Sequence, residues 1–259
     1  MRLKDRIAVI TGAGSGLGRA GALAFAAEGA RVVVSDIDAA RGEETTRLAR
    51  EHGGQASFIR ADVGQRAEAK ALIDETVARL GGLDILYNNA GIAPLGRDGF
   101  TPFITEDDWD WILRVNLTSV FLCCKYAIPV MAHRPGAGII NTASSMAVLP
   151  LGMTDAYAAA KAGVANLTRS MAPGCALMGI RVNALAPGYV DTHMNSVIFD
   201  NAAYREAFAK DHAMGLQPPA DVASVAVFLA SDEAAGLTGA VITCDRGWTS
   251  FKRPSLLAT

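Results

Sequence analysis

Tyr157 and Lys161 are the first residues in the chain whose spacing suggests chemistry. They stand four apart in an alanine-rich run, Tyr-Ala-Ala-Ala-Lys. In a helix this spacing places both side chains on one face, one turn apart. A lysine ammonium near a phenol favours the phenolate, so we expect the pKa of Tyr157 to fall from about 10 and the phenol to serve as a general acid or base. Such pairs are also common on solvated helix faces, so the spacing alone is weak evidence.

Two further polar residues could complete this site. Ser144 lies 13 residues before Tyr157, at the end of an expected strand, 138–144. The carboxyl ends of parallel strands face the ligand crevice of an α/β sheet, where the Ser144 hydroxyl could bind a substrate oxygen beside the phenol. Asn116 falls within an expected helix although Asn is a mediocre helix former. It is either a polar residue facing the sheet or a distortion that exposes a carbonyl to water.

A glycine-rich turn predicts a dinucleotide site. Residues 11–18, Thr-Gly-Ala-Gly-Ser-Gly-Leu-Gly, follow an apolar strand and precede a helix. Glycine allows a tight turn and close approach to a pyrophosphate, which the free N–H groups of the helix would bind. The next strand ends at Asp36, 18 residues after the last glycine, where an acid holds the adenosine ribose hydroxyls. The simpler alternative is an ordinary turn and a surface acid. The predicted cofactor residues here are Gly12, Ser15, Gly16, Leu17, Gly18 and Asp36.

Short β-branched runs alternate with longer helical patterns along the whole chain. Most of the expected strands are continuously apolar, as in a sheet that helices cover on both faces. The expected strands are 7–11, 31–36, 57–62, 83–88, 138–144, 181–186 and 240–245, and the expected helices are 17–28, 65–80, 105–132, 156–171 and 219–230. Alternating strands and helices joined by right-handed crossovers predict an α/β chain, one domain over residues 1–259. The fold class is a doubly wound parallel sheet of about seven strands.

Composition narrows the classes of function. Of the 259 residues 51% are hydrophobic, which excludes a disordered chain. With 24 Lys and Arg against 26 Asp and Glu, the net charge of −2 gives no basic excess for nucleic acid. We find no apolar run of the roughly 18 residues that a membrane span requires, and no signal region. The four cysteines show neither a disulfide framework nor a metal-ligand spacing, so we expect a cytoplasmic protein without a metal.

Over nearly its whole length the sequence resembles the classical short-chain dehydrogenases/reductases. The motifs that carry the resemblance occur in the same order along the chain. They are Gly12 to Gly18, Asp62-Val63, Asn88-Asn89-Ala90-Gly91, Asn116, Ser144, Tyr157-x-x-x-Lys161, Arg181-Val182-Asn183 and Pro187-Gly188-Tyr189-Val190-Asp191-Thr192. The resemblance implies a Rossmann-like fold, a nicotinamide cofactor and a catalytic set of Asn116, Ser144, Tyr157 and Lys161.

The resemblance also implies a role for each matched residue. Asp62 and Val63 would contact the adenine, and Asn89, Ala90 and Gly91 would pack on the adenosine. Pro187, Gly188, Val190 and Thr192 would surround the nicotinamide, with Thr192 reaching its carboxamide. Lys161 would also grip the ribose, and Asn116 would hold a water in a relay from Lys161 to solvent. Ser144 would orient the substrate oxygen, and Tyr157 would exchange the proton during hydride transfer.

Three places depart from the family pattern. Pro173-Gly174 replaces a typical helical sequence, and since proline within a helix costs about 3 kcal/mol we expect that helix to break or kink. Asp245-Arg246-Gly247 stands where Asp-Gly-Gly is usual, and the stretch 96–103 is slightly longer than typical.

Taken together, the sequence predicts an NAD-dependent oxidoreductase that interconverts a secondary alcohol and a ketone. A hydrophobic or cyclic substrate is expected because the residues flanking the site are mostly apolar: Ile92, Ala93, Leu95, Met146, Leu149, Leu151, Met153, Tyr189 and Met194. Residues 191–217 would form a mobile lid. We expect a homo-oligomer, a tetramer or a dimer, through the apolar helices 109–132 and 156–171.

Two other functions fit parts of the pattern. A 3-oxoacyl-thioester reductase that uses NADPH would share the fold, but such enzymes tend to carry Arg in the glycine loop and to lack the strand-end acid, whereas this chain has Ser15 and Asp36. A catalytically silent, cofactor-binding regulatory protein would usually have lost Tyr157 or Lys161, and both are present.

Overall fold

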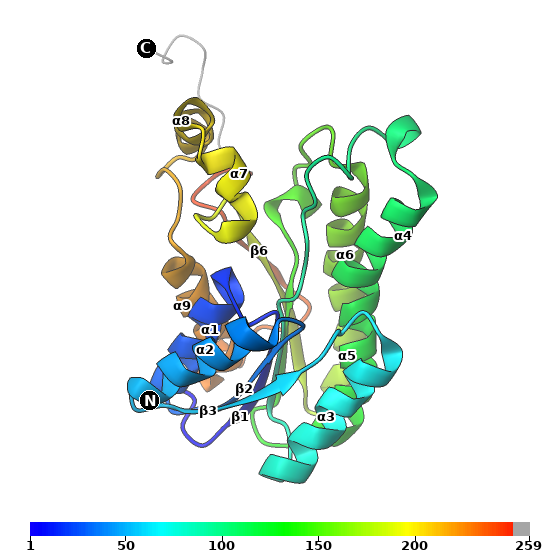
Figure 1. The fold of residues 1–259 in the computed structure, drawn as a ribbon. Helices are drawn as coiled ribbons and strands as arrows, with labels where there is room; N and C mark the ends of the chain where they lie inside the picture. Colours follow the sequence, from blue (N-terminus) through cyan, green and yellow to red (C-terminus); the bar gives the residue numbers. More distant parts are fainter. Residues whose placement is uncertain (251–259) are drawn as a thin grey trace.

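The computed structural model describes residues 1–250 and contains a seven-stranded, wholly parallel sheet. The strand order is β3-β2-β1-β4-β5-β6-β7, which confirms the predicted Rossmann-like, doubly wound α/β fold (Figure 1). The strands are β1 (Ile7–Thr11), β2 (Arg31–Asp36), β3 (Gln55–Arg60), β4 (Ile85–Asn88), β5 (Gly138–Thr142), β6 (Arg181–Pro187) and β7 (Val241–Cys244). The order reverses between β1 and β4, and ligands bind at such a switch point in sheets of this type.

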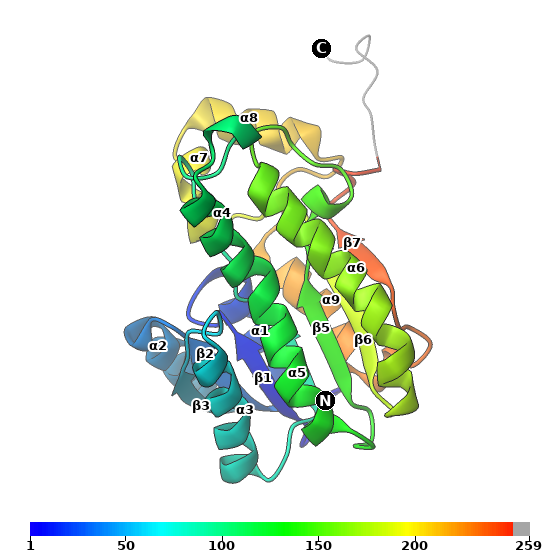
Figure 2. The ribbon, with the colours of Figure 1, turned by 90° about the vertical axis from the view of Figure 1, so that its right-hand side faces the viewer.

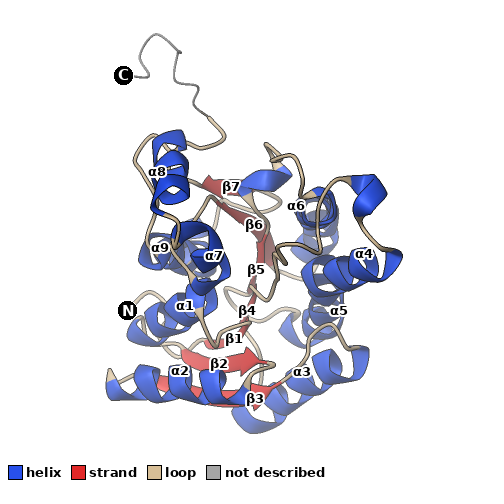
Figure 3. Cartoon of the chain, turned by 45° about the horizontal axis from the view of Figure 1, so that its top comes forward, coloured by secondary structure: helices blue, strands red, loops and turns tan. Residues whose placement is uncertain are grey.

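Helices cover both faces of the sheet (Figure 3). One face carries α1, α2 and α9, and the other carries α3, α5 and α6, with α4 on the same side of the sheet. The α-helices are α1 (Gly16–Ala27), α2 (Ala39–Glu51), α3 (Arg66–Leu80), α4 (Glu106–Leu113), α5 (Ser119–Met131), α6 (Asp155–Leu177), α7 (Ser196–Phe199), α8 (Ala202–Asp211) and α9 (Pro219–Ala230). Short 3₁₀ turns occupy Thr101–Phe103, Ser145–Ala147, His193–Asn195 and Asp232–Ala234.

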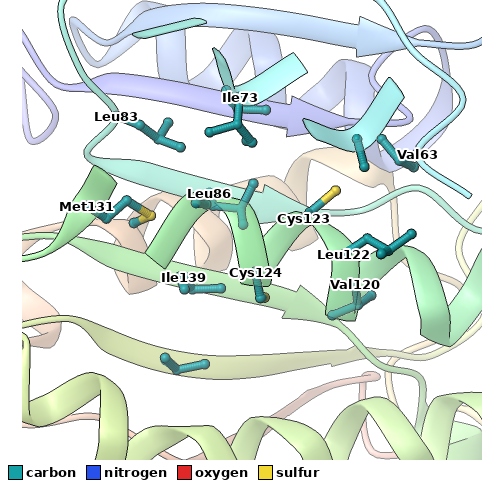
Figure 4. Packing of buried hydrophobic residues seen from close by; sticks show 14 of the residues in the cluster. Val63, Ile73, Leu83, Leu86, Val120, Leu122, Cys123, Cys124, Met131 and Ile139 are labelled. Carbon is teal, nitrogen blue, oxygen red and sulfur yellow. The ribbon is translucent and has the colours of Figure 1, made fainter. Parts of the chain in front are cut away.

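Alternating strand residues feed two separate cores because successive side chains point to opposite faces. Val9 packs with Leu86 and Ile139 under α3 and α5, and Figure 4 shows Ile139 beside Cys124 of α5 and Leu86 between Ile73 of α3 and Cys124. Ile10 belongs to the opposite core with Phe25 of α1. Burial on both faces explains the continuously apolar strands and fixes the register of the sheet.

The long helix expected over residues 105–132 is interrupted. It consists of α4, a π-helical segment (Arg114–Thr118) and α5. Among the described residues this continuous run, Glu106–Met131, is also long and apolar enough to cross a membrane, contrary to the expectation of no such run. Buried core helices meet the same criterion, and 44% of its apolar window is buried inside the structure.

The expected break at Pro173 is wrong, because α6 continues through it to Leu177 (Figure 2), while the alternative, a kink, stays a prediction. Pro173 cannot donate to the carbonyl of Arg169, but both residues are exposed, so water can satisfy that carbonyl. On either side of Pro173, α6 still buries Ala172 and Cys175. This burial offsets the lost hydrogen bond and keeps the helix intact.

Replacing this proline should therefore stabilise the protein. Pro173→Ala restores one backbone donor at an exposed helical position, and we expect the free energy of unfolding to rise by about 1–3 kcal/mol. Denaturant unfolding measures it, with Ser170→Ala as the control on the same exposed stretch. An unchanged or lower stability would contradict this account of α6.

Candidate active site

A cavity of about 580 Å³ lies at the carboxyl ends of the strands and collects the predicted residues. Every predicted cofactor and catalytic residue lines it except Gly18. Those residues are Gly12, Ser15, Gly16, Leu17, Asp36, Asp62, Val63, Asn89, Ala90, Gly91, Asn116, Ser144, Tyr157, Lys161, Pro187, Gly188, Val190 and Thr192. Residues from eight separate segments of the sequence thus meet in one place. Their individual roles remain predictions.

The glycine loop is packed too tightly for side chains at two positions. Gly12 has φ +62°, and a Cβ there would lie 2.7 Å from the Cα of Ala90. Gly18 lies behind the cavity wall, where a Cβ would come within 2.2 Å of the Gly12 carbonyl oxygen. α1 then begins at Gly16, and the side chain of its N-cap Ser15 makes no capping hydrogen bond. The free amides of this helix start fit the diphosphate of a nicotinamide dinucleotide.

Thr11 and Asn89 fasten the glycine loop to the end of β4. The Thr11 hydroxyl accepts hydrogen bonds from the amides of Asn89 (3.0 Å) and Ala90 (3.1 Å). The Asn89 side chain donates to the carbonyls of Thr11 (3.0 Å) and Gly12 (3.2 Å). The two strands on either side of the switch point are therefore joined through their carboxyl-terminal loops.

Asp36 is half-buried at the end of β2, as predicted, and it is held by backbone amides. Its carboxylate accepts from the amides of Gly14 (2.7 Å) and Asp38 (2.9 Å). The neighbouring arginines have other partners, since Arg41 pairs with Asp38 at 3.3 Å and Arg19 donates to the Gly14 carbonyl at 2.6 Å. Asp36 therefore brings a fixed negative charge to the cavity.

α6 carries the reactive pair. Tyr157, a half-buried residue, lies in its first turn, and Lys161 follows one turn later. Lys161 is only 3% exposed, and its Nζ donates to the Thr142 carbonyl at 2.9 Å and lies 5.6 Å from the centre of the Tyr157 ring. The Ser144 side chain lies near enough to Tyr157 to affect the pKa of its phenol, and the Ser144 Oγ accepts a hydrogen bond from the amide of Met146 at 3.2 Å. The chain thus brings the three predicted groups together.

The electrostatics differ from the expectation that Lys161 lowers the pKa of Tyr157. Burial raises the pKa of the Tyr157 phenol above its usual value, although the nearby Ser144 side chain partly opposes this. Burial also lowers the pKa of Lys161 to about 8. Both shifts have one cause, because a site shielded from water disfavours each charged form. In the protein alone, desolvation therefore outweighs the attraction between ammonium and phenolate.

Asn116 lies within the π-helical segment, so the helix is distorted where the sequence suggested. Its amide nitrogen donates to the carbonyls of Ile112 and Ile92 (3.0 Å each), and its Oδ1 accepts from the Ile92 amide at 3.1 Å. A Cβ on Gly91 would lie 2.8 Å from that oxygen and 3.3 Å from Lys161 Nζ. Asn116 thus holds the loop after β4 beside Lys161. The water relay remains a prediction.

The expected lid region contains α7 and α8, which lie at the same end of the molecule as the start of α6 (Figure 2). Its two ends are joined by a bridge between Val190 and Gln217. Arg246, at φ +47°, binds the Asp221 carboxylate (2.6 Å) and the carbonyl of Leu216 (2.8 Å). The arginine that replaces a usual glycine therefore fastens the C-terminal base of the lid.

Sequence reasoning missed several residues of the cavity wall and misplaced one. Asp98, Trp111 and Arg114 line the cavity, as does Phe208 of α8, whereas the expected Leu149 does not. The unusual length of the stretch 96–103 was a signal for Asp98, but nothing in the spacing indicated Phe208.

Comparison with known proteins agrees with this geometry. The family model described as "Enoyl-(Acyl carrier protein) reductase" matches residues 12–249. The chain is 39% identical to a cis-4-hydroxycyclohexanecarboxylate dehydrogenase of Sinomonas cyclohexanicum, over 95% of this chain and 97% of that one. It is 36% identical to the 3-oxoacyl-[acyl-carrier-protein] reductase of Thermotoga maritima, over 95% and 99%. A crystal structure of a dehydrogenase/reductase from Sinorhizobium meliloti superposes with a TM-score of 0.89 at 34% identity, covering 96% of each chain.

The burial of Lys161 makes a specific prediction about stability and pH. Its pKa is about 8 in the folded chain and 10.5 when unperturbed, so folding is penalised below pH 8 and the penalty disappears as the pH rises to 10.5. Relative to Lys161→Met, the wild type should therefore gain about 3 kcal/mol of unfolding free energy between pH 7 and pH 11. Urea unfolding at both pH values measures the difference. A stability difference between the wild type and Lys161→Met that does not change with pH would refute the lowered pKa of Lys161.

Proposed function

The chain belongs to the short-chain dehydrogenase/reductase family, and on that premise we propose that it is an NAD-dependent oxidoreductase acting on a hydrophobic or cyclic secondary alcohol or its ketone. The observation that carries the proposal is the convergence of Ser144, Tyr157 and Lys161 on the cavity that also contains the glycine cradle. A reactive phenol, a hydroxyl and an ammonium beside a dinucleotide site are the parts that this reaction needs.

Each residue then has a defined task. The nicotinamide nucleotide, when bound, supplies the redox chemistry. Tyr157 takes the hydroxyl proton of the alcohol, or returns it to the carbonyl oxygen in the reverse direction. Ser144 orients that oxygen and stabilises charge on it, while the Lys161 ammonium favours the phenolate. Lys161 is buried and hydrogen-bonded to the Thr142 carbonyl, which places its Nζ 5.6 Å from the centre of the Tyr157 ring.

The matched residues would hold the nucleotide along the cavity. Asp62 and Val63 would meet the adenine, and Asn89, Ala90 and Gly91 the adenosine. Pro187, Gly188, Val190 and Thr192 would enclose the nicotinamide end. The glycine loop would take the diphosphate, since two of its positions admit no side chain.

The lining of the cavity favours an apolar substrate. Of the nine apolar residues expected there, eight are on the wall, including Leu151, Met153 and Met194. The cation Arg114 lines the cavity near the adenine side, where it adjoins Gly64. A cyclic alcohol suits this wall, and a relative that is a cis-4-hydroxycyclohexanecarboxylate dehydrogenase supports this class.

The second candidate is a 3-oxoacyl-thioester reductase using NADPH. The similarity to the Thermotoga maritima reductase favours it. Asp36 argues against NADPH, because its carboxylate would face the 2′-phosphate, and Arg19 and Arg41 already have partners. A side-by-side assay of cyclohexanol with NAD and of an acetoacetyl thioester with NADPH separates the two.

We also propose a cytoplasmic homo-oligomer, a tetramer or a dimer. The proposed interface is the helix pair of α4–α5 and α6, on which Trp109 and Phe121 are exposed, at 36% and 47%. Large apolar side chains exposed along one continuous helical run are typical of subunit contacts.

Removing the phenol should abolish turnover. Tyr157→Phe deletes the proton donor but keeps the ring, so we expect kcat to fall by at least about 1000-fold while NADH still binds. Initial rates on a panel of alcohols and ketones with NAD and NADP measure the first effect, and fluorescence titration with NADH the second. Lys161→Ala should impair both turnover and NADH binding. A Tyr157→Phe enzyme with normal kcat would disprove the assignment.

Asp36 should set the cofactor preference. We expect the wild type to favour NAD over NADP at least about tenfold in kcat/KM, since two anions within a few ångströms repel each other. Asp36→Ala should narrow or reverse that preference. It should also weaken the binding of both nucleotides somewhat, because the Gly14 amide loses its hydrogen-bond acceptor. Asp36→Asn is the control that keeps an acceptor for Gly14 without the charge. Equal efficiency of NAD and NADP in the wild type would contradict this role.

A further inference from the structure

The helix that carries Tyr157 is not capped by its own N-cap residue. Thr154 precedes α6, but its hydroxyl donates to the Leu151 carbonyl at 2.8 Å and makes no capping bond. A helix start leaves its first amides without intrahelical partners, and a side-chain acceptor usually satisfies them. The amides at the start of α6 must therefore be satisfied from elsewhere.

Asp98 supplies the missing cap from the loop after β4. Its Oδ1 accepts from the amide of Ala156 at 3.1 Å, and its Oδ2 accepts from the amide of Tyr157 at 2.9 Å. The Gly99 carbonyl accepts from the amide of Asp155 at 3.2 Å. Three consecutive amides at the start of α6, including that of Tyr157 itself, are thus held by two residues far away in sequence. A carboxylate also complements the positive end of the helix dipole.

The residue before Asp98 fixes the same loop to a different helix. The Arg97 guanidinium forms an ion pair with Asp108 of α4 and lies over the Trp111 ring, 4.2 Å from its centre. Asp98 and Trp111 both line the cavity. Neighbouring side chains therefore brace the loop between α4 on one side and α6 on the other.

A second contact joins the loop to α6 without touching the Tyr157 amide. The Asp155 carboxylate accepts from the amide (2.9 Å) and the hydroxyl (2.6 Å) of Thr101. Thr101 is exposed, whereas Asp98 is partly buried. This outer contact provides a matched control, because its loss leaves the capped amides intact.

We propose that Asp98 is a positioning residue for the reaction: it sets the place of the Tyr157 backbone and ties it to the loop that lines the cavity. The inference rests on the proposed role of Tyr157 as the acid/base. Leu95 of the same loop lies on the cavity wall, so one carboxylate links the reacting phenol to part of the substrate-facing surface. Small displacements of a reacting group lower the rate steeply, so loss of this link should lower kcat.

The experiment compares Asp98→Ala and Asp98→Asn with Thr101→Val in the full-length protein. Rates are measured with cyclohexanol and NAD, nucleotide affinity by NADH fluorescence, and exchange of the Ala156 and Tyr157 amides by hydrogen–deuterium exchange. We expect Asp98→Ala to lower kcat at least about tenfold, with NADH affinity unchanged within about twofold and both amides exchanging faster. Asp98→Asn keeps one acceptor, so it should fall between Asp98→Ala and the wild type. Thr101→Val should match the wild type in kcat and at both amides.

Each other outcome overturns a defined part of the inference. Normal exchange at both amides in Asp98→Ala would show that Asp98 is not the cap. Faster exchange with an unchanged kcat would show that the cap does not position the phenol. If Asp98→Ala does not fold, kcat and amide exchange measured on Asp98→Asn test the proposal instead. A wild type without activity on any alcohol would instead refute the proposed function, and the exchange measurement would still test the cap.

Discussion

The junction between β1 and β4 is the constraint on which the rest of the site depends. All seven strands run parallel, so their carboxyl ends share one edge, and only at this reversal of strand order do the following loops part to opposite faces. Thr11 and Asn89 lock the two loops together through side chain to backbone hydrogen bonds. The close approach of Gly12 to Ala90 is a consequence of that lock. The glycine cradle on one side and the reactive helix on the other are therefore positioned from the same place.

Within this site, burial disfavours the charged forms of the two reactive groups. Lys161 and Tyr157 are both poorly hydrated, and burial shifts the pKa of each toward its neutral form. Burying an ammonium costs free energy by itself. Its attraction to a nearby oxygen becomes strong, however, when negative charge develops on that oxygen in a medium of low polarity. The buried position of Lys161 therefore suits an ammonium that stabilises charge formed during the reaction rather than one that stabilises the folded protein.

Local signals in the sequence predicted most of the fold, and motif order predicted the gathering of the site. Asp36 and the glycines were identified because strand ends and backbone-limited turns leave local marks in the sequence. Pro173 was misjudged because a helix penalty is local while the burial of Ala172 and Cys175 that outweighs it is not. The pKa of Tyr157 was misjudged for a similar reason, since desolvation depends on everything that surrounds the ring. Phe208 lies on the cavity wall because the lid region brings α8 there, and no local spacing in the sequence indicates the course of the lid.

The remote cap on α6 has a consequence for the order in which the molecule is built. Asp98 and Tyr157 are 59 positions apart, and the Thr11–Asn89 contact spans 78. Each contact of such separation costs loop-closure entropy, because distant parts of the chain must be brought together. A chain emerging from the ribosome contains both partners of the β1–β4 junction before α6 has been made, whereas the base of the lid requires Arg246, which is synthesised after all seven strands. The β1–β4 junction can therefore form before the base of the lid, and the substrate side of the cavity is completed only after Arg246 has been made.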